Sequence, residues 1–252
     1  MGKTSFSLGG FLAGLLFPPR CLCCGELCGP SGLCDTCAEG LHRVGEDPCR
    51  FCGRDRERCR CRCGEELLFE QAVGAFYYEQ TGRTLLHRFK FRGDTACYDQ
   101  VLASYFLERT AAAFGKIPID WVIPVPMYEK ETERFDQTLY LARSLSRAMG
   151  IPYRTDLLKK IRKTPPQHRQ KKETRKENVQ GAFLACKKQA LQGVCILLVD
   201  DVATTFSTLN TCAAALKEAG ADRILCASLM TAAENKTDRE DNHGRNDDRY
   251  RY

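Results

Sequence analysis

The sequence predicts an α/β protein in which a parallel-sheet domain follows a small cysteine-rich module. Two observations support this fold class. After residue 67, apolar runs of strand length alternate with amphipathic helical stripes, and 11 of the 16 cysteines lie within residues 21–63. With 252 residues and a hydrophobic fraction of 43%, the chain is long enough to bury a substantial core.

The chain begins with an apolar run, Phe6 to Pro19. The run contains two adjacent glycines, ends in two prolines and is too short to span a bilayer core of about 30 Å. A signal peptide is the alternative, but Lys3 is its single basic residue and no clear small-x-small cleavage site precedes Cys21. We therefore expect residues 1–20 to form a short helix that docks on the body of the protein, with no membrane span.

Residues 21–64 are predicted to form a zinc-ribbon-like module. The cysteines occur in C-x-x-C and C-x-C knuckles, and two knuckles supply the four thiolates of a closed structural zinc site. The two predicted ligand sets are Cys21, Cys24, Cys34 and Cys37, and Cys49, Cys52, Cys61 and Cys63. Cys59 could replace Cys61, and Cys23 or Cys28 could compete in the first set. An iron–sulfur cluster and a redox dithiol are the alternatives. Metal-binding thiols favour a reducing compartment, so we expect the cytoplasm.

Residues 65–233 are predicted to form the α/β domain. The expected strands are residues 121–126, 181–185, 194–200 and 223–229, and the last two are apolar throughout, as in a sheet covered on both faces. Two helices are expected from apolar stripes at helical spacing. The stripes are Leu139, Ala142, Leu145 and Ala148, and Leu209, Cys212, Ala213, Leu216 and Ala219. The tail, residues 234–252, lacks aliphatic side chains and is expected to be disordered.

The stretch ILLVDDVATTFSTLN, residues 196–210, is the strongest candidate for a ligand site. Asp200 and Asp201 end an apolar strand, and four hydroxyl residues occupy the turn into the next helix. A helix that starts at the carboxyl end of a parallel sheet offers free N–H groups to a phosphate. Two carboxylates fit there if the ligand also carries a diol and Mg²⁺ offsets the phosphate charge. The candidate phosphate-binding residues are Ala203, Thr204, Thr205, Phe206, Ser207 and Thr208. Alternatively, the acids end a strand and the hydroxyls cap a helix.

Residues 154–176 carry ten Lys or Arg against two acids, a balance of +8 that exceeds the +6 of the whole chain. Such a segment could close over a diphosphate, hold a nucleic-acid backbone or form a solvated surface. A second basic run, HRFKFR at residues 87–92, interleaves two phenylalanines.

The stretch from Asp200 resembles the D-D-x-x-T-T-G-x-T motif with which type I phosphoribosyltransferases bind phosphoribosyl diphosphate (PRPP). The whole chain resembles the ComF family of competence-associated proteins over about residues 10–232. The shared segments, in order, are LLFPPRCLCC, the cysteine knuckles, HRFKFRGD, VIPVP, KIRKTPPQ and VDDVATT. This resemblance implies a type I phosphoribosyltransferase fold, an N-terminal zinc module and a link to DNA uptake, through single-stranded DNA or the uptake machinery.

The resemblance also implies roles for particular residues. Asp200 and Asp201 would be the catalytic pair that holds the ribose hydroxyls. The pyrophosphate loop would be Val125, Pro126, Met127 and Tyr128. A flexible basic loop containing Arg162, Lys163, Arg169, Lys171, Lys172 and Arg175 would close over the diphosphate.

Two departures from the family pattern leave two hypotheses open. Phe206 stands where the motif has glycine, and VPMYEKETERFDQT, residues 125–138, lacks the family's glycine and carries three glutamates. The chain is then either an enzyme that transfers phosphoribosyl to a nitrogenous acceptor, or a non-catalytic PRPP sensor or adaptor that binds DNA or a protein partner.

Overall fold

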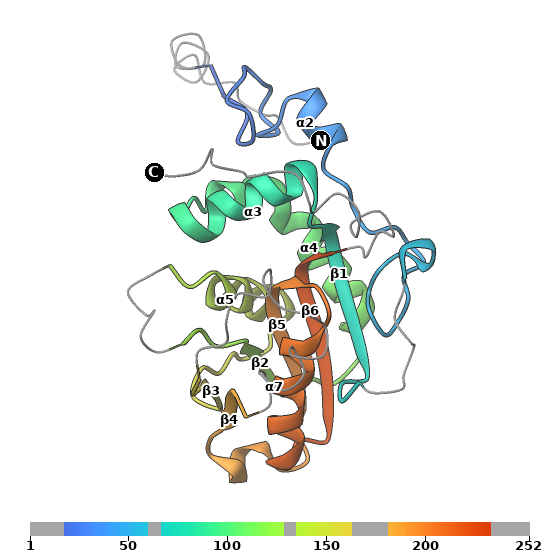
Figure 1. The fold of residues 1–252 in the computed structure, drawn as a ribbon, viewed down its shortest axis with the longest axis vertical. Helices are drawn as coiled ribbons and strands as arrows, with labels where there is room; N and C mark the ends of the chain where they lie inside the picture. The colour runs from blue at the N-terminus through green and yellow to red at the C-terminus, as the bar shows by residue number, and fades with distance from the viewer. Residues whose placement is uncertain (1–17, 60–66, 129–134, 163–180, 233–252) are drawn as a thin grey trace, which may run out of the picture.

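We describe the fold from a computed structural model, in which residues 18–59, 67–128, 135–162 and 181–232 are described. Its centre is a four-stranded sheet in the order β1-β6-β5-β2 (Figure 1). The strands are β1 (Gln71–Tyr77), β2 (Trp121–Pro124), β5 (Cys195–Ala203) and β6 (Arg223–Thr231), and all of their pairings are parallel. The expected parallel-sheet fold is confirmed.

Each strand of this sheet arises from a short apolar run. In the register, Trp121 of β2 pairs with Ile196 of β5, and Cys195 of β5 pairs with Arg223 of β6. Strand β1 was not expected, although its sequence QAVGAFY is mostly apolar and buried. Because β5 and β6 are covered on both faces, most of their side chains are apolar and buried, which is why the sequence identified these two strands most clearly.

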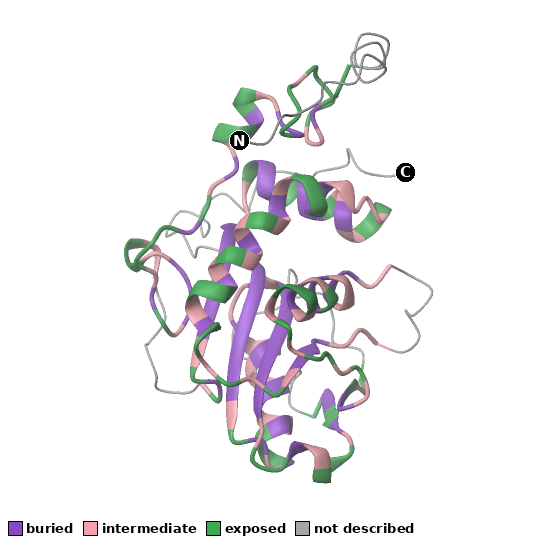
Figure 2. Ribbon diagram, turned by 180° about the vertical axis from the view of Figure 1, so that it is seen from behind, coloured by how far each residue is buried: buried purple, intermediate pink, exposed green. Residues whose placement is uncertain are grey.

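Helices cover both faces of the sheet. Leu197 and Val199 of β5 share one core with α3 (Gln80–Arg92), α4 (Ala103–Phe114) and α5 (Gln137–Met149), and a π-helical turn (Cys97–Leu102) leads into α4. Ile196 and Leu198 share the opposite core with α7 (Ser207–Glu218). Both expected helices, α5 and α7, are confirmed. Figure 2 shows the buried strands between the helical layers, whose outer surfaces are exposed.

A two-stranded antiparallel sheet lies beside this core. It pairs β3 (Leu158–Lys160) with β4 (Phe183–Ala185), and a 3-10 turn (Lys188–Leu191) follows. The strand expected at residues 181–185 is therefore present over its last three residues, outside the parallel sheet. Phe183 and Leu158 point into the core that holds α7, so the small sheet closes that side of the domain.

The cysteine-rich segment packs directly on the α/β domain. It contains α2 (Asp35–Glu39) and a 3-10 turn (Arg56–Arg58). Its residues 42–44 run along the outer edge of β1, where Tyr77 donates its N–H to the His42 carbonyl (2.9 Å) and Val44 donates to the Ala75 carbonyl (2.9 Å). Most of the N-terminal helix expected at residues 1–20 and the whole tail at 234–252 lie outside the described residues, and residues 18–20 form no helix. Every helix within the described ranges is too short or too polar to cross a bilayer.

Candidate functional site

The two acids predicted at the end of β5 are both buried. Asp200 is 7% exposed and Asp201 is 6% exposed. Asp201 donates its N–H to the Asp200 carboxylate (2.8 Å), and Val202 donates its N–H to the other carboxylate, that of Asp201 (2.8 Å). The two carboxylates are thus fixed by the backbone that follows each of them. The carboxyl end of a central parallel strand is where α/β sheets place their ligands.

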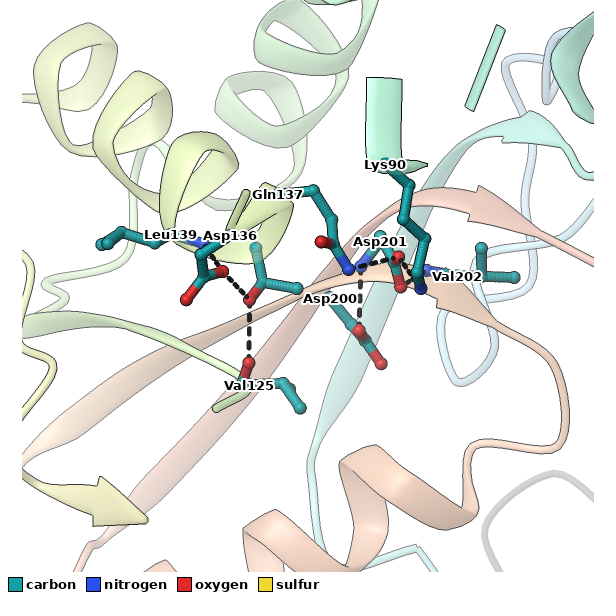
Figure 3. A network of polar contacts seen from close by, with 9 residues as sticks. Lys90, Val125, Asp136, Gln137, Leu139, Asp200, Asp201 and Val202 are labelled. Atoms are coloured by element: carbon teal, nitrogen blue, oxygen red, sulfur yellow. Dashed lines mark hydrogen bonds and ion pairs between the residues drawn. The ribbon is translucent and has the colours of Figure 1, made fainter. Parts of the chain in front are cut away.

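Two side chains from neighbouring helices reach the Asp201 carboxylate (Figure 3). The Lys90 ammonium, on α3, donates to Asp201 Oδ2 (2.6 Å), and the Gln137 amide, on α5, donates to the same oxygen (2.9 Å). The strand, α3 and α5 therefore converge on one carboxylate. A buried anion held by a cation and an amide is compensated, whereas its neighbour Asp200 has no such partner in this network.

This asymmetry separates the pKa values of the two acids. Burial raises the pKa of Asp200 well above its ordinary range, and the adjacent Asp201 charge raises it further. Burial also opposes ionisation of Asp201, but the Lys90 charge and the hydrogen bonds from Lys90 and Gln137 outweigh it and lower the pKa of Asp201. The pair therefore holds one carboxylate ionised beside Lys90 and one carboxyl that keeps its proton more readily.

The start of α5 joins this pair to the loop after β2. Asp136 caps the helix by accepting the Leu139 N–H (2.9 Å), and Thr138 donates its hydroxyl to the Val125 carbonyl (2.8 Å) (Figure 3). Asp136 also accepts the Thr138 hydroxyl (2.9 Å). Because Gln137 lies between these two residues, the cap that fixes the helix also aims Gln137 at Asp201.

The predicted phosphate-binding residues run from the last residue of β5, Ala203, through a short turn to the first residues of α7, Ser207 and Thr208, and we call residues 203–208 the phosphate loop. A small recess, partly open to solvent, is lined by Asp200, Val202 and Leu209 together with Ala203, Thr204, Phe206, Ser207 and Thr208. Thr205 lies beside them, with its hydroxyl 2.9 Å from the Ser207 hydroxyl. The N-cap residue of α7 is Phe206, whose side chain makes no capping hydrogen bond. The recess thus combines hydroxyl groups with a helix start that lacks a side-chain cap, which is a suitable place for an anion.

Phe206 stands at the position where the phosphoribosyl diphosphate motif has glycine. Its backbone adopts φ 60° and ψ 3°, the left-handed conformation that glycine adopts without strain. For a phenylalanine this conformation costs about 1–3 kcal/mol. The ring is 6% exposed and packs against Phe69, with ring centroids 5.8 Å apart, and against the Arg54 guanidinium, 5.2 Å from the ring centroid. The loop therefore keeps its tight turn, and the packing of the Phe206 ring against Phe69 and Arg54 offsets the strain.

The other predicted phosphate contacts are only partly described. Val125 is buried and pairs with β5 through its N–H, which donates to the Val199 carbonyl (2.8 Å). Pro126 and Met127 are half-buried, and Tyr128 forms a bridge with Lys160 of β3. Arg162 is exposed at the end of β3. The remaining residues of the predicted basic loop lie outside the described residues, namely Lys163, Arg169, Lys171, Lys172 and Arg175.

The first predicted cysteine set is assembled as expected. The Sγ atoms of Cys21, Cys24, Cys34 and Cys37 all lie within 4.8 Å of one another, and the Cys24 and Cys34 sulfurs are 3.7 Å apart. A tetrahedral zinc with Zn–S bonds of about 2.3 Å requires sulfurs about 3.8 Å apart. Burial opposes ionisation of Cys21, but N–H groups of the knuckles outweigh it and lower its pKa to about 6. This geometry and the presence of a thiolate fit a metal ion.

The second set contains Cys49, Cys52 and Cys59, whose sulfurs also lie within 4.8 Å of one another. Cys52 and Cys59 are 3.5 Å apart. Cys61 and Cys63 lie outside the described residues, so the fourth ligand is not defined. Burial raises the pKa of Cys52 to about 12, and the neighbouring thiols of Cys59 and Cys49 add to this effect. These sulfurs are therefore also arranged for a metal.

Three residues of this region were not identified from the sequence. Lys90 lies four residues after buried Leu86, so a lysine on the apolar stripe of α3 was an available signal for a buried acidic partner. Gln137 gave no signal beyond its place at the start of a helix. Arg54 contacts the phosphate loop from 150 residues away in the sequence, and a side-chain contact over that separation has no local sequence signature.

The chain is similar in sequence to known proteins. Residues 136–249 match the family model described as phosphoribosyl transferase domain. The chain is 30% identical to competence protein F of Haemophilus influenzae over 225 residues, 84% of this chain and 97% of that protein. It is 28% identical to DNA utilization protein YhgH of Salmonella typhi, over 79% of this chain and 91% of the relative. Among solved structures, adenine phosphoribosyltransferase of Saccharomyces cerevisiae is 17% identical with a TM-score of 0.35, over 52% of this chain and 66% of that chain.

Proposed function

Because the chain belongs to the family of competence protein F, we propose that it binds a phosphorylated ribose such as PRPP, together with Mg²⁺, in a process that handles DNA. The chain has a phosphoribosyl transferase domain. The domain covers α5, β5, α7 and β6, the elements that carry the acidic pair and the phosphate loop.

One observation carries this proposal. Two buried carboxylates end β5, and within six residues the same chain passes through a hydroxyl-lined recess into the start of α7. A free phosphate would be repelled by the acids, and a plain diol would not use the helix start. A ribose with a terminal phosphate uses both, because its hydroxyls donate to a carboxylate while its phosphate accepts from the loop.

Each residue has a distinct role in this proposal. Asp200 accepts hydrogen bonds from the ribose hydroxyls, and Lys90 and Gln137 keep the neighbouring Asp201 ionised and in place. The loop hydroxyls and the first N–H groups of α7 hold the 5′-phosphate. The loop formed by Val125, Pro126, Met127 and Tyr128 faces the diphosphate. The basic residues between 162 and 176 close over it.

Two kinds of metal ion take part. Mg²⁺ would enter with the ligand and neutralise part of the diphosphate charge. Zinc would be held by Cys21, Cys24, Cys34 and Cys37, whose four sulfurs match its tetrahedral preference, and by the cluster of Cys49, Cys52 and Cys59. The described cysteines form no disulfide bonds, and metal-binding thiols suit the cytoplasm.

The reaction that fits this site is transfer of the phosphoribosyl group to a nitrogenous acceptor. The bond from the anomeric carbon to the diphosphate oxygen breaks, diphosphate leaves with the electron pair, and the acceptor nitrogen forms the new bond. The ionised carboxylate stabilises the positive charge that develops on the sugar. Residues around the recess orient the two reactants.

Titration calorimetry with PRPP and Mg²⁺ tests the binding proposal. The wild-type chain is expected to bind, and the Asp200→Asn/Asp201→Asn double variant is expected to bind at least tenfold more weakly. Asp222→Asn is the matched control, because Asp222 is an exposed acid outside the site. Absence of binding heat from the wild-type chain would remove the proposal. Diphosphate release that stops in the double variant would extend it to transfer.

A second candidate function, binding of single-stranded DNA, is favoured by the outer face of α3. Phe91 is 58% exposed and its ring centroid lies 4.3 Å from that of the His87 ring, on the helix that also carries the exposed residues Arg83 and Arg92. Exposed rings among cations can stack with bases and contact phosphates. A Phe91→Ala variant should weaken binding to single-stranded DNA, and a Lys171→Ala/Lys172→Ala variant should reduce the salt slope by up to about two units. Affinity unchanged by both variants would exclude these surfaces.

A further inference from the structure

Arg54 connects the second cysteine cluster to the phosphate loop. It lies two residues after Cys52 and is 3% exposed. One guanidinium nitrogen donates to the Thr204 carbonyl, the Nε donates to the Thr231 hydroxyl (3.1 Å), and the guanidinium lies 5.2 Å from the centroid of the Phe206 ring. A single side chain thus contacts the loop at two residues and the end of β6 at a third.

The backbone that carries Arg54 is fixed in place. Cys49 donates its N–H to the Arg54 carbonyl (2.7 Å) and Gly53 donates to the Cys49 carbonyl (2.7 Å), which closes a tight turn around the knuckle. Gly53 has φ +66°, and a Cβ there would lie 2.5 Å from the Gly74 nitrogen on β1. Only a glycine permits this close approach, so the knuckle lies directly against the sheet. Movement of the cluster would therefore move Arg54.

The charge of Arg54 also bears on the recess. Its partners in the described part of the chain are a carbonyl, a hydroxyl and the face of a ring, and none of these is a carboxylate. A buried cation with neutral partners is poorly compensated, and an anion bound nearby would improve its energy. Thr204, whose carbonyl accepts from Arg54, lines the recess proposed to hold the phosphate.

The packing around the Phe206 ring also connects the second cysteine cluster to the phosphate loop. Phe206, Phe69, Cys49 and Cys52 belong to one buried cluster. The strained left-handed backbone at Phe206 persists because this cluster and the guanidinium hold the ring. If the knuckle loosened, the ring would lose its support and the loop its fixed turn.

We propose that Arg54 is a positioning residue through which the second cysteine cluster sets the conformation of the phosphate loop. Metal binding at Cys49, Cys52 and Cys59 therefore raises the affinity of the loop for a phosphorylated ligand. The part concerning the ligand rests on the proposed function. The part concerning the loop conformation does not, and it can be measured without any ligand.

Hydrogen exchange followed by mass spectrometry tests the loop conformation. The ligand-free Arg54→Met variant keeps an apolar stem but loses the donors, and the amides of residues 203–210 are expected to exchange at least tenfold faster than in the wild type. The strands β5 and β6 are expected to keep their slow exchange. Arg50→Met is the matched control, since Arg50 is an exposed arginine in the same knuckle. Unchanged exchange at 203–210, or equal acceleration throughout the sheet, would overturn the proposal.

A substitution at the cluster tests the connection to the metal. Cys59→Ser is expected to accelerate exchange in the same loop, and the Arg54→Met/Cys59→Ser double variant is expected to add little to either single change, since both act through one side chain. Additive effects in the double variant would show that the cluster and Arg54 act separately, and would contradict the proposal. If Arg54→Met does not fold, Arg54→Lys against Arg50→Lys replaces it, because a lysine cannot reproduce the two-pronged donor.

Calorimetry with PRPP and Mg²⁺ completes the test. Arg54→Met is expected to weaken binding at least tenfold, and Arg50→Met is expected to bind as the wild type does. If the wild type binds no PRPP, the proposed function fails, while the exchange experiment still decides whether Arg54 sets the loop. If the wild type binds and Arg54→Met binds equally well, the positioning role fails and the proposed function stands.

Discussion

The two cysteine clusters are similar in sequence but support different sides of the candidate site. Cys21 and Cys37 of the first cluster are buried in the core that contains α3, and Leu22 accepts a hydrogen bond from Arg88 of that helix (2.5 Å). Cys49 and Cys52 of the second cluster belong to the opposite core, with the phosphate loop. One cluster thus supports the helix that carries Lys90, and the other supports the loop.

This division suggests why the cysteine-rich segment accompanies the domain. The four sulfurs of the first cluster leave a zinc ion no open position, so a metal there would not act on a substrate directly. Its effect would reach the site through the helix and loop that it holds. Both contacts end on arginines, Arg88 and Arg54, whose side chains donate to backbone carbonyls.

Loss of a metal ligand should produce the largest effects and separate the clusters most sharply. A structural zinc contributes on the order of 10 kcal/mol to folding of a small module, so Cys24→Ser and Cys59→Ser should each lose one metal ion and lower the stability markedly. Metal content by mass spectrometry and hydrogen exchange are the measurements. We expect Cys24→Ser to loosen α3 and Cys59→Ser to loosen residues 203–210. Loosening of the same segment in both variants would contradict the division.

Substitution of Phe206 tests the second cluster from the side of the loop. Phe206→Ala should reduce the free energy of unfolding by about 3 kcal/mol, because it removes a buried ring and keeps the strained backbone. Phe206→Gly loses the same ring but relieves the strain, so it should be more stable than the alanine variant by roughly 1 kcal/mol. Chemical denaturation measures both. An alanine variant at least as stable as the glycine variant would show that the left-handed conformation is not maintained.

Substitution of Arg88 tests the first cluster in the same way. Arg88→Met loses hydrogen bonds to the Leu22 carbonyl and to Asp94 (2.7 Å), and should reduce the free energy of unfolding by about 1–3 kcal/mol. It should loosen α3 and leave the phosphate loop unchanged by hydrogen exchange. Arg83→Met is the control, because Arg83 lies on the same helix and is exposed. If the two variants behave alike, Arg88 does not hold the cluster to the helix.

The smallest expected effect is the pH dependence of ligand binding. Burial beside Asp201 raises the pKa of Asp200 to about 8, and the proposed ligand needs its ionised form. Affinity should therefore rise with pH as the proton is lost, roughly fivefold from pH 7 to 8 and less than twofold from pH 8 to 9. Calorimetry in two buffers should detect proton release on binding. Asp200→Asn should remove this dependence, and a dependence that survives the substitution would assign it to another group.

The sequence predicted the parts of the molecule that depend on local patterns. The apolar runs of β5 and β6 and the stripes of α5 and α7 were confirmed, because each depends on short-range spacing. The four cysteines of the first set lie together in the structure for the same reason. Strand β1 was missed because glycine and alanine residues make its apolar run less distinct. Contacts across the fold could not be predicted. Nothing near Arg54 in the sequence identifies Thr204, and nothing near Lys90 identifies Asp201.

The most direct test of the central claim is a crystal structure of the chain with PRPP and Mg²⁺. We expect the ribose hydroxyls at the Asp200 carboxylate and the 5′-phosphate at the start of α7, with the Phe206 ring still against Phe69 and Arg54. A ligand bound elsewhere, or a Phe206 ring that occupies the place of the phosphate, would contradict it.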